Sequence, residues 1–105
     1  MIERSIQELV DEEVSTFSFA HEIDVECFLS HRIFPKPISL CMDFERKEWR
    51  ECYLVTDHNG LDDSPYRMAF DPECGQFVRE ITLEDGTPHY LVRGKCLEDL
   101  VDLFA

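Results

Sequence analysis

Long apolar runs are missing from this chain of 105 residues. No stretch approaches the roughly 18 uncharged apolar residues that a membrane-spanning helix needs. The first residues, MIERSIQELVDEEV, also lack the basic segment followed by an apolar run that marks a secretory signal. We therefore expect a cytoplasmic protein that is neither exported by a standard signal nor embedded in a membrane.

Closely paired cysteines and glycine-rich loops are missing as well. The five cysteines lie 11 to 22 residues apart with no Cys-x-x-Cys pair, so neither a disulfide framework nor a zinc knuckle is indicated. The four glycines are well separated, which leaves no backbone cradle for phosphate groups. We expect free thiols, mostly packed as small apolar side chains, and no cofactor.

Metal and catalytic motifs are sparse. The four histidines lack the spacing of metal sites or zinc hydrolases. The best local cluster of ligands is Asp57 and His58 with Asp62 and Asp63, but it does not match a calcium-binding loop, which favours an ordinary hydrophilic turn. Cys74, in the turn DPECGQ, is the cysteine expected to be most exposed, and no basic residue stands close to it in the sequence. We expect no metal ion and no enzymatic activity.

Basic side chains are few. Ten Lys and Arg residues face 23 Asp and Glu residues, which gives a net charge of −13. This excess is larger than the solubility of a small domain requires. Direct binding to nucleic acid is disfavoured, because the phosphate backbone would be repelled. The charge therefore indicates a basic protein as the partner.

Apolar residues are plentiful enough for a folded core. Hydrophobic residues make up 44% of the chain and aromatic residues 11%, which argues against disorder in spite of the charge. A chain of this length is expected to form one domain, so residues 1–105 are interpreted as a single α+β domain.

The two ends of the chain show helical periodicity. Near the start, apolar side chains at helical spacing predict a helix with an acidic outer face (Ile2, Ile6, Leu9, Val10 and Val14). Near the end, a second helix is predicted with Leu97, Leu100, Val101 and Phe104 on its buried face. The acidic residues of that helix are expected to point away (Glu98, Asp99 and Asp102).

Between the helices, alternation predicts strands. Residues 17–29 alternate between apolar and polar positions, which predicts a half-buried strand whose polar side carries Glu22, Asp24 and Glu26 in a row about 7 Å apart. Residues 30–37 hold two prolines and are expected to form a connection or a sheet edge. Further strands are predicted over 38–44, 49–55, 66–70, 76–83 and 88–93. The sequence thus predicts an antiparallel sheet of about six strands in a meander, with an N-terminal and a C-terminal helix packed on it.

In its size, acidity, antiparallel α+β pattern and acidic last helix, GKCLEDLVDLF after the strand PHYLVR, the chain resembles the small immunity proteins of bacterial toxin systems. These include the systems of contact-dependent growth inhibition. The resemblance implies a cytoplasmic bacterial inhibitor that binds one cognate toxin, often a nuclease, and covers its active site. It assigns no functional residue by position.

The partner-binding residues are predicted among the carboxylates of the acidic segments: Glu22, Asp24, Glu26, Asp62, Asp63, Glu98, Asp99 and Asp102. Three alternatives remain open. The chain could be a phage-type nuclease inhibitor that imitates a polyanion, or an adaptor or structural subunit in which acidity prevents self-association. It could also be a small enzyme or ligand binder with a site near His58 and Cys74, if the two loops meet. The oligomeric state is not set by the sequence.

Overall fold

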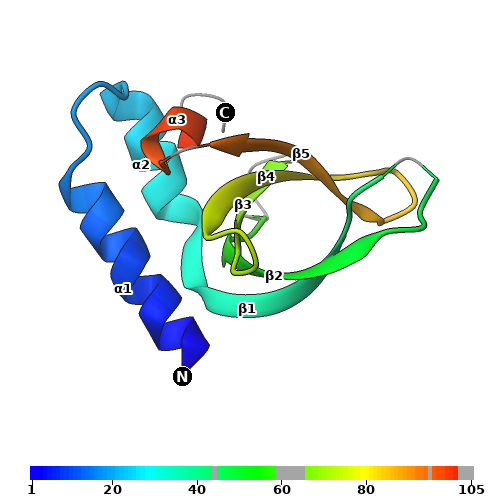
Figure 1. Cartoon of the computed structure of the whole chain (residues 1–105). Helices are drawn as coiled ribbons and strands as arrows, with labels where there is room; N and C mark the ends of the chain where they lie inside the picture. Colours follow the sequence, from blue (N-terminus) through cyan, green and yellow to red (C-terminus); the bar gives the residue numbers. More distant parts are fainter. Residues whose placement is uncertain (44, 59–65, 95, 102–105) are drawn as a thin grey trace.

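The computed structural model describes residues 1–43, 45–58, 66–94 and 96–101. Its elements confirm the α+β class (Figure 1). Along the chain they are α1 (Ile2–Ser15), α2 (Glu22–His31), β1 (Arg32–Cys41), β2 (Trp49–Thr56), β3 (Tyr66–Asp71), β4 (Gln76–Thr82), β5 (Pro88–Gly94) and α3 (Glu98–Val101). Among the described residues, no helix is long and apolar enough to cross a membrane.

The five strands follow the predicted meander. Each strand pairs in antiparallel fashion with the next, from β1 to β5. The sheet then closes on itself, because β1 meets β5 in parallel fashion where Cys41 lies opposite His89. The helices lie together on one flank of this curled sheet, with α1 alongside β1 (Figure 1).

The prolines of β1 lie inside a strand rather than in a connection. β1 begins at Arg32 and includes Pro35 and Pro37. The pairing with β2 is irregular between Arg32 and Lys36 and becomes regular from Lys36 onward. Pro35 falls in the irregular stretch, where a residue that cannot donate to the sheet ladder is tolerated, whereas Pro37 lies within the regular pairing, opposite Tyr53.

The strand predicted over residues 17–29 is wrong, since Glu22–His31 form α2. Val25 and Phe28 are three residues apart and therefore share one side of a helix, where both pack into the core. Ile23, which the strand pattern placed on the buried side, is 74% exposed. A short apolar segment can match the periodicity of a strand and that of a helix about equally well. Here the contacts of Val25 and Phe28 with the core favour the helix.

The change of element also separates the predicted row of carboxylates. Glu22 and Asp24 occupy the first turn of α2, where negative charge interacts favourably with the helix dipole. Glu22 and Glu26 are one helical turn apart and both exposed, whereas Asp24 is half-buried. The straight row of three carboxylates along a strand is therefore replaced by two carboxylates on the outer side of a helix.

Two apolar clusters fill the two faces of the sheet. One joins α1, α2 and α3 to the sheet through side chains such as Val55, Met68 and Phe77. The other contains no helix residue and is formed by Leu40, Cys52, Leu54, Ala69 and Val78. Leu54 and Val55 are neighbours in β2 and must point to opposite faces, so the second cluster lies on the face enclosed by the closed sheet.

Candidate interaction surface

Exposed apolar side chains and two exposed carboxylates occur together on α2 and just before it. Ile23 is 74% exposed, Leu29 44%, and Phe19, just before the helix, 61%. Glu22 and Glu26 are exposed on the same helix. We call these five residues the α2 face. Large exposed apolar side chains that gather near charged groups are typical of protein interaction sites.

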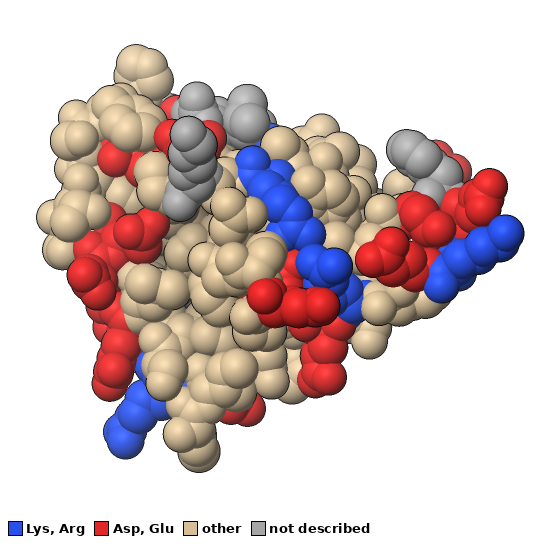
Figure 2. Space-filling view, in the orientation of Figure 1, with Lys and Arg blue, Asp and Glu red and all other residues tan. Residues whose placement is uncertain are grey.

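Of the other predicted acidic residues, the structure describes Asp24, Glu98 and Asp99. Asp99 is exposed in α3. Asp62, Asp63 and Asp102 lie outside the described residues. Figure 2 shows acidic side chains spread over much of one side of the molecule, with a short band of basic side chains across its middle. Acidic side chains are therefore not confined to α2. The α2 face combines two of them with three exposed large apolar side chains, while single apolar side chains such as Phe34 and Trp49 are exposed elsewhere.

Glu98 departs from its prediction, because it points inward. It is only 5% exposed, and its Oε2 atom accepts hydrogen bonds from the backbone N–H groups of Ser18, Phe19 and Ala20 at 2.6, 2.7 and 2.8 Å. Burial raises the pKa of Glu98, but the three N–H donors outweigh it and hold the pKa below its usual range. Glu98 thus fastens the α1–α2 connection to α3 and is not available as a surface contact.

Asp57, from the predicted ligand cluster, is engaged in ion pairs. Its carboxylate lies 2.8 Å from Lys36 Nζ and 3.2 Å from Arg67 Nη1. Burial raises the pKa of Asp57, but Lys36, the His58 N–H and Arg67 lower it more, to about 2. Within the described ranges, no group of three His, Cys, Asp or Glu side chains is placed to hold a metal ion.

Cys74 is exposed as expected, but it has a basic neighbour that the sequence does not reveal. Arg93 Nη1 donates a hydrogen bond to Cys74 Sγ at 2.6 Å and another to Asp71 Oδ2 at 3.0 Å. Arg93 is 19 residues further along the chain and comes close only because β4 pairs with β5. Cys74 thus adjoins the Asp71–Arg93 pair, whereas His58 directly follows Asp57, which pairs with Arg67.

Two ion networks lie at opposite ends of the face that carries the enclosed apolar cluster. At one end, Asp71 accepts hydrogen bonds from Arg50 and Arg93. At the other end, Arg67 pairs with Glu80 and with Asp57. Asp71 and Glu80 have fully buried side chains. Each is paired with a guanidinium, as a buried charge requires. Both networks therefore serve to stabilise the fold.

Comparisons with protein families, with curated proteins and with solved structures found no match to this chain.

Proposed function

We propose that the protein is an immunity protein, a non-enzymatic acidic inhibitor that neutralises a basic toxin, such as a nuclease, in the bacterial cytoplasm. The observation that carries the proposal is the α2 face, where Phe19, Ile23 and Leu29 are exposed beside two carboxylates. The net charge of −13 supports a basic partner.

The two kinds of side chain on the α2 face would act at different stages of binding. Carboxylates attract a basic partner over long range, which speeds association and makes it sensitive to salt. Apolar anchors act after contact, because they lose their exposure to water and slow dissociation. Glu22 and Glu26 would therefore govern the association rate, and Ile23 and Leu29 the lifetime of the complex.

Affinity capture tests the proposal. The tagged protein is used to capture partners from a lysate of its native cells at low and at moderate salt, and bound proteins are identified by mass spectrometry. We expect a basic toxin or nuclease, retained in stoichiometric amount and inactive in the complex. If no basic protein is retained at either salt concentration, the proposal is wrong.

Two matched double variants then test the α2 face with the captured partner. Glu22→Gln with Glu26→Gln removes two exposed carboxylates one turn apart on α2, and Glu8→Gln with Glu12→Gln does the same on α1. We expect the α2 pair to slow association several-fold more than the α1 pair, and Ile23→Ser to speed dissociation about tenfold. Equal effects of the two pairs would assign the attraction to the overall charge and remove the α2 face from the proposal.

A further inference from the structure

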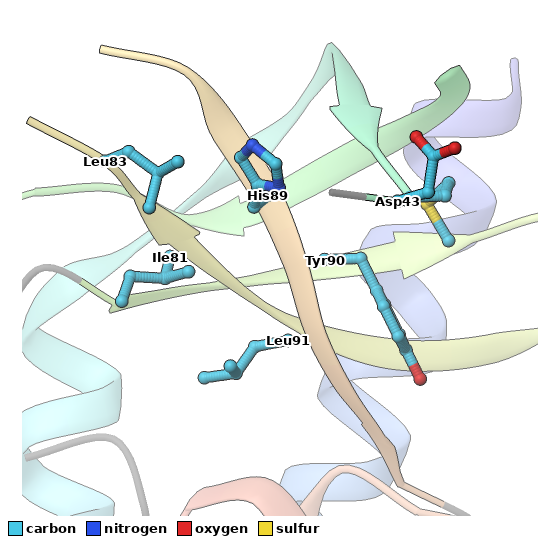
Figure 3. A pocket seen from close by; sticks show the side chains of 7 residues that line it. Asp43, Ile81, Leu83, His89, Tyr90 and Leu91 are labelled. Atoms are coloured by element: carbon cyan, nitrogen blue, oxygen red, sulfur yellow. The ribbon is translucent and has the colours of Figure 1, made fainter. Parts of the chain in front are cut away.

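A pocket of about 270 Å³ lies where β5 meets the end of β1. The residues that line it include Asp43, Ile81, Leu83, His89, Tyr90 and Leu91. Figure 3 shows Ile81, Leu83 and Leu91 on one side, with Tyr90 and Asp43 on the other. Leu83 and Leu91 are 36% and 46% exposed, so the pocket opens to solvent at these two residues. Among the described lining residues, Asp43 alone is acidic.

An irregularity in β5 shapes the apolar part of the pocket. Arg79 lies opposite Val92 and Glu80 lies opposite Tyr90, so Leu91 is an extra residue in β5. In a regular strand, successive side chains point to opposite faces. The bulge allows Tyr90 and Leu91 to line the same pocket.

The carboxylate of Asp43 is held in place by one oxygen and leaves the other accessible. Oδ1 accepts hydrogen bonds from the backbone N–H groups of Lys47 and Glu48 at 2.9 and 3.2 Å. None of the described residues donates a hydrogen bond to Oδ2, and Oδ2 is not one of the buried polar atoms that lack a partner. Asp43 as a whole is half-buried. Its Oδ2 atom is therefore open to solvent and able to accept a hydrogen bond from a ligand.

The charge around the pocket favours a cation. Within the described part of the chain, the basic side chains nearest in sequence or space form ion pairs with carboxylates other than Asp43: Arg46 with Asp85, Lys47 with Glu45, and Arg93, which lies over the ring of Tyr90, with Asp71. The segments that follow β1 and β4, residues 42–48 and 83–87, together contain five acidic and two basic residues. This local excess adds to the net charge of −13, so a cation is attracted and an anion is repelled.

The volume and the apolar wall define the rest of the ligand. A dry cavity of about 150 Å³ is enough to hold benzene, and this pocket measures about 270 Å³. An ammonium group forms a charge-assisted hydrogen bond with a carboxylate, which is stronger than a bond between neutral groups. We propose that the pocket binds a small organic cation, a primary amine with one or two rings, whose ammonium group donates to Asp43 Oδ2 while the rings pack against Ile81 and Leu91. This site is independent of the proposed binding of a toxin through the α2 face.

Titration of the full chain with 2-naphthylmethylamine, which is protonated at neutral pH, tests the proposal. Calorimetry and NMR of the backbone amides follow the binding at about 0.15 M NaCl, where attraction to exposed surface charges is screened. We expect one saturable site with a dissociation constant below about 1 mM, and shifts confined to residues around the pocket. The alcohol of the same shape, 2-naphthylmethanol, is expected to bind about tenfold more weakly because it is neutral. Absence of saturable binding, or equal affinity for the two probes, would overturn the proposal.

Asp43→Asn separates the charge of this residue from its structural role. The variant keeps an oxygen that can accept from the Lys47 and Glu48 N–H groups, but it removes the charge. It is expected to weaken binding of the amine about tenfold and to leave binding of the alcohol unchanged. Asp99→Asn, at an exposed carboxylate of α3, changes the net charge equally and is expected to affect neither probe. Equal effects of the two variants would assign the attraction to the overall charge and overturn the proposal.

Two leucine variants test the apolar wall. Leu91→Lys places a positive charge at the opening of the pocket and is expected to abolish binding of the amine, whereas Leu29→Lys, at a leucine of similar exposure on α2, leaves it unchanged. Circular dichroism checks that each variant is folded. If Asp43→Asn does not fold, the two leucine variants decide, and equal effects of both would contradict the proposed site.

Discussion

At the scale of single residues, Asp71 shows how a carboxylate is stabilised inside a very acidic protein. Its side chain is fully buried and lies 2.8 Å from Arg50 Nη1 and 3.0 Å from Arg93 Nη1. Burial raises the pKa of Asp71, but the hydrogen bonds from Arg50, Arg93, Cys74 and the backbone of Glu73 outweigh it and lower the pKa to about 2.

This depressed pKa predicts a loss of stability in acid. The folded-state pKa lies below the value of about 3.9 expected for an unfolded chain, so the ionised carboxylate stabilises the fold above about pH 5. The stabilisation is lost as the pH falls towards 2. Asp71→Asn is therefore expected to lower the free energy of unfolding by about 2 kcal/mol at pH 7, and the deficit is expected to shrink between pH 5 and pH 2.

Urea unfolding at pH 7, 4 and 2.5 measures this deficit for wild type and variant. Asp99→Asn is the control, because Asp99 is exposed and its removal changes the net charge equally. A deficit of Asp71→Asn that stays constant from pH 7 to pH 2.5 would contradict the prediction.

The burial of Glu98 is a property of a single residue that the sequence does not reveal. Its three N–H partners are 78 to 80 residues earlier in the chain. In the sequence it looks like any acidic residue on the outer side of a short helix. Only the contact between α3 and the α1–α2 connection reveals that its carboxylate is buried, because a local pattern carries no information on distant neighbours.

At the scale of elements, α2 explains why the sequence could be interpreted in two ways. Val25 and Phe28 fit a helix, while residues 17–29 also alternate as a strand would. The longer and more regular patterns were compatible with only one kind of element. Periodicity predicted the positions of five elements correctly: α1, β2, β3, β4 and β5. Short segments that match two periods are decided by the surface against which they pack.

Two substitutions in α2 test this element. Phe28 is fully buried, so Phe28→Ala is expected to lower the free energy of unfolding by about 3 to 5 kcal/mol. Ile23 is 74% exposed, and Ile23→Ser is expected to change it by no more than about 0.5 kcal/mol. Urea unfolding followed by circular dichroism measures both values. A cost above about 2 kcal/mol for Ile23→Ser would indicate the buried position that the strand interpretation requires.

At the scale of the whole molecule, the net charge of −13 opposes folding through repulsion among surface carboxylates. Salt screens exposed charges, and the screening length falls from about 10 Å at 0.1 M to about 3 Å at 1 M. The buried pairs of Asp71 and Glu80 with arginines are screened much less.

Added salt is therefore expected to stabilise the protein. We expect the melting temperature to rise by about 5 °C between 0.05 and 0.5 M NaCl, which corresponds to about 1 kcal/mol for a domain of this size. Calorimetry measures the change, and Glu8→Gln with Glu12→Gln, which carries less repulsion, is expected to respond less. A melting temperature that falls with salt would show that surface ion pairs outweigh the repulsion.

The sequence by itself determined the properties that depend on composition and on regular local patterns. These are the α+β class, the meander order of the strands, the acidity of the surface and the exposure of Glu22, Glu26 and Cys74. Each follows from the charge count, the periodicity or the turn residues, and these signals depend only on composition and on residues that are close together in the sequence.

Tertiary structure alone decided the features that join distant segments. It closed the sheet through Cys41 and His89, made residues 22–31 a helix and buried the carboxylate of Glu98. It also placed Arg93 beside Cys74. These features depend on which surfaces pack together and on how the buried charges are paired, and that information is spread over the whole chain.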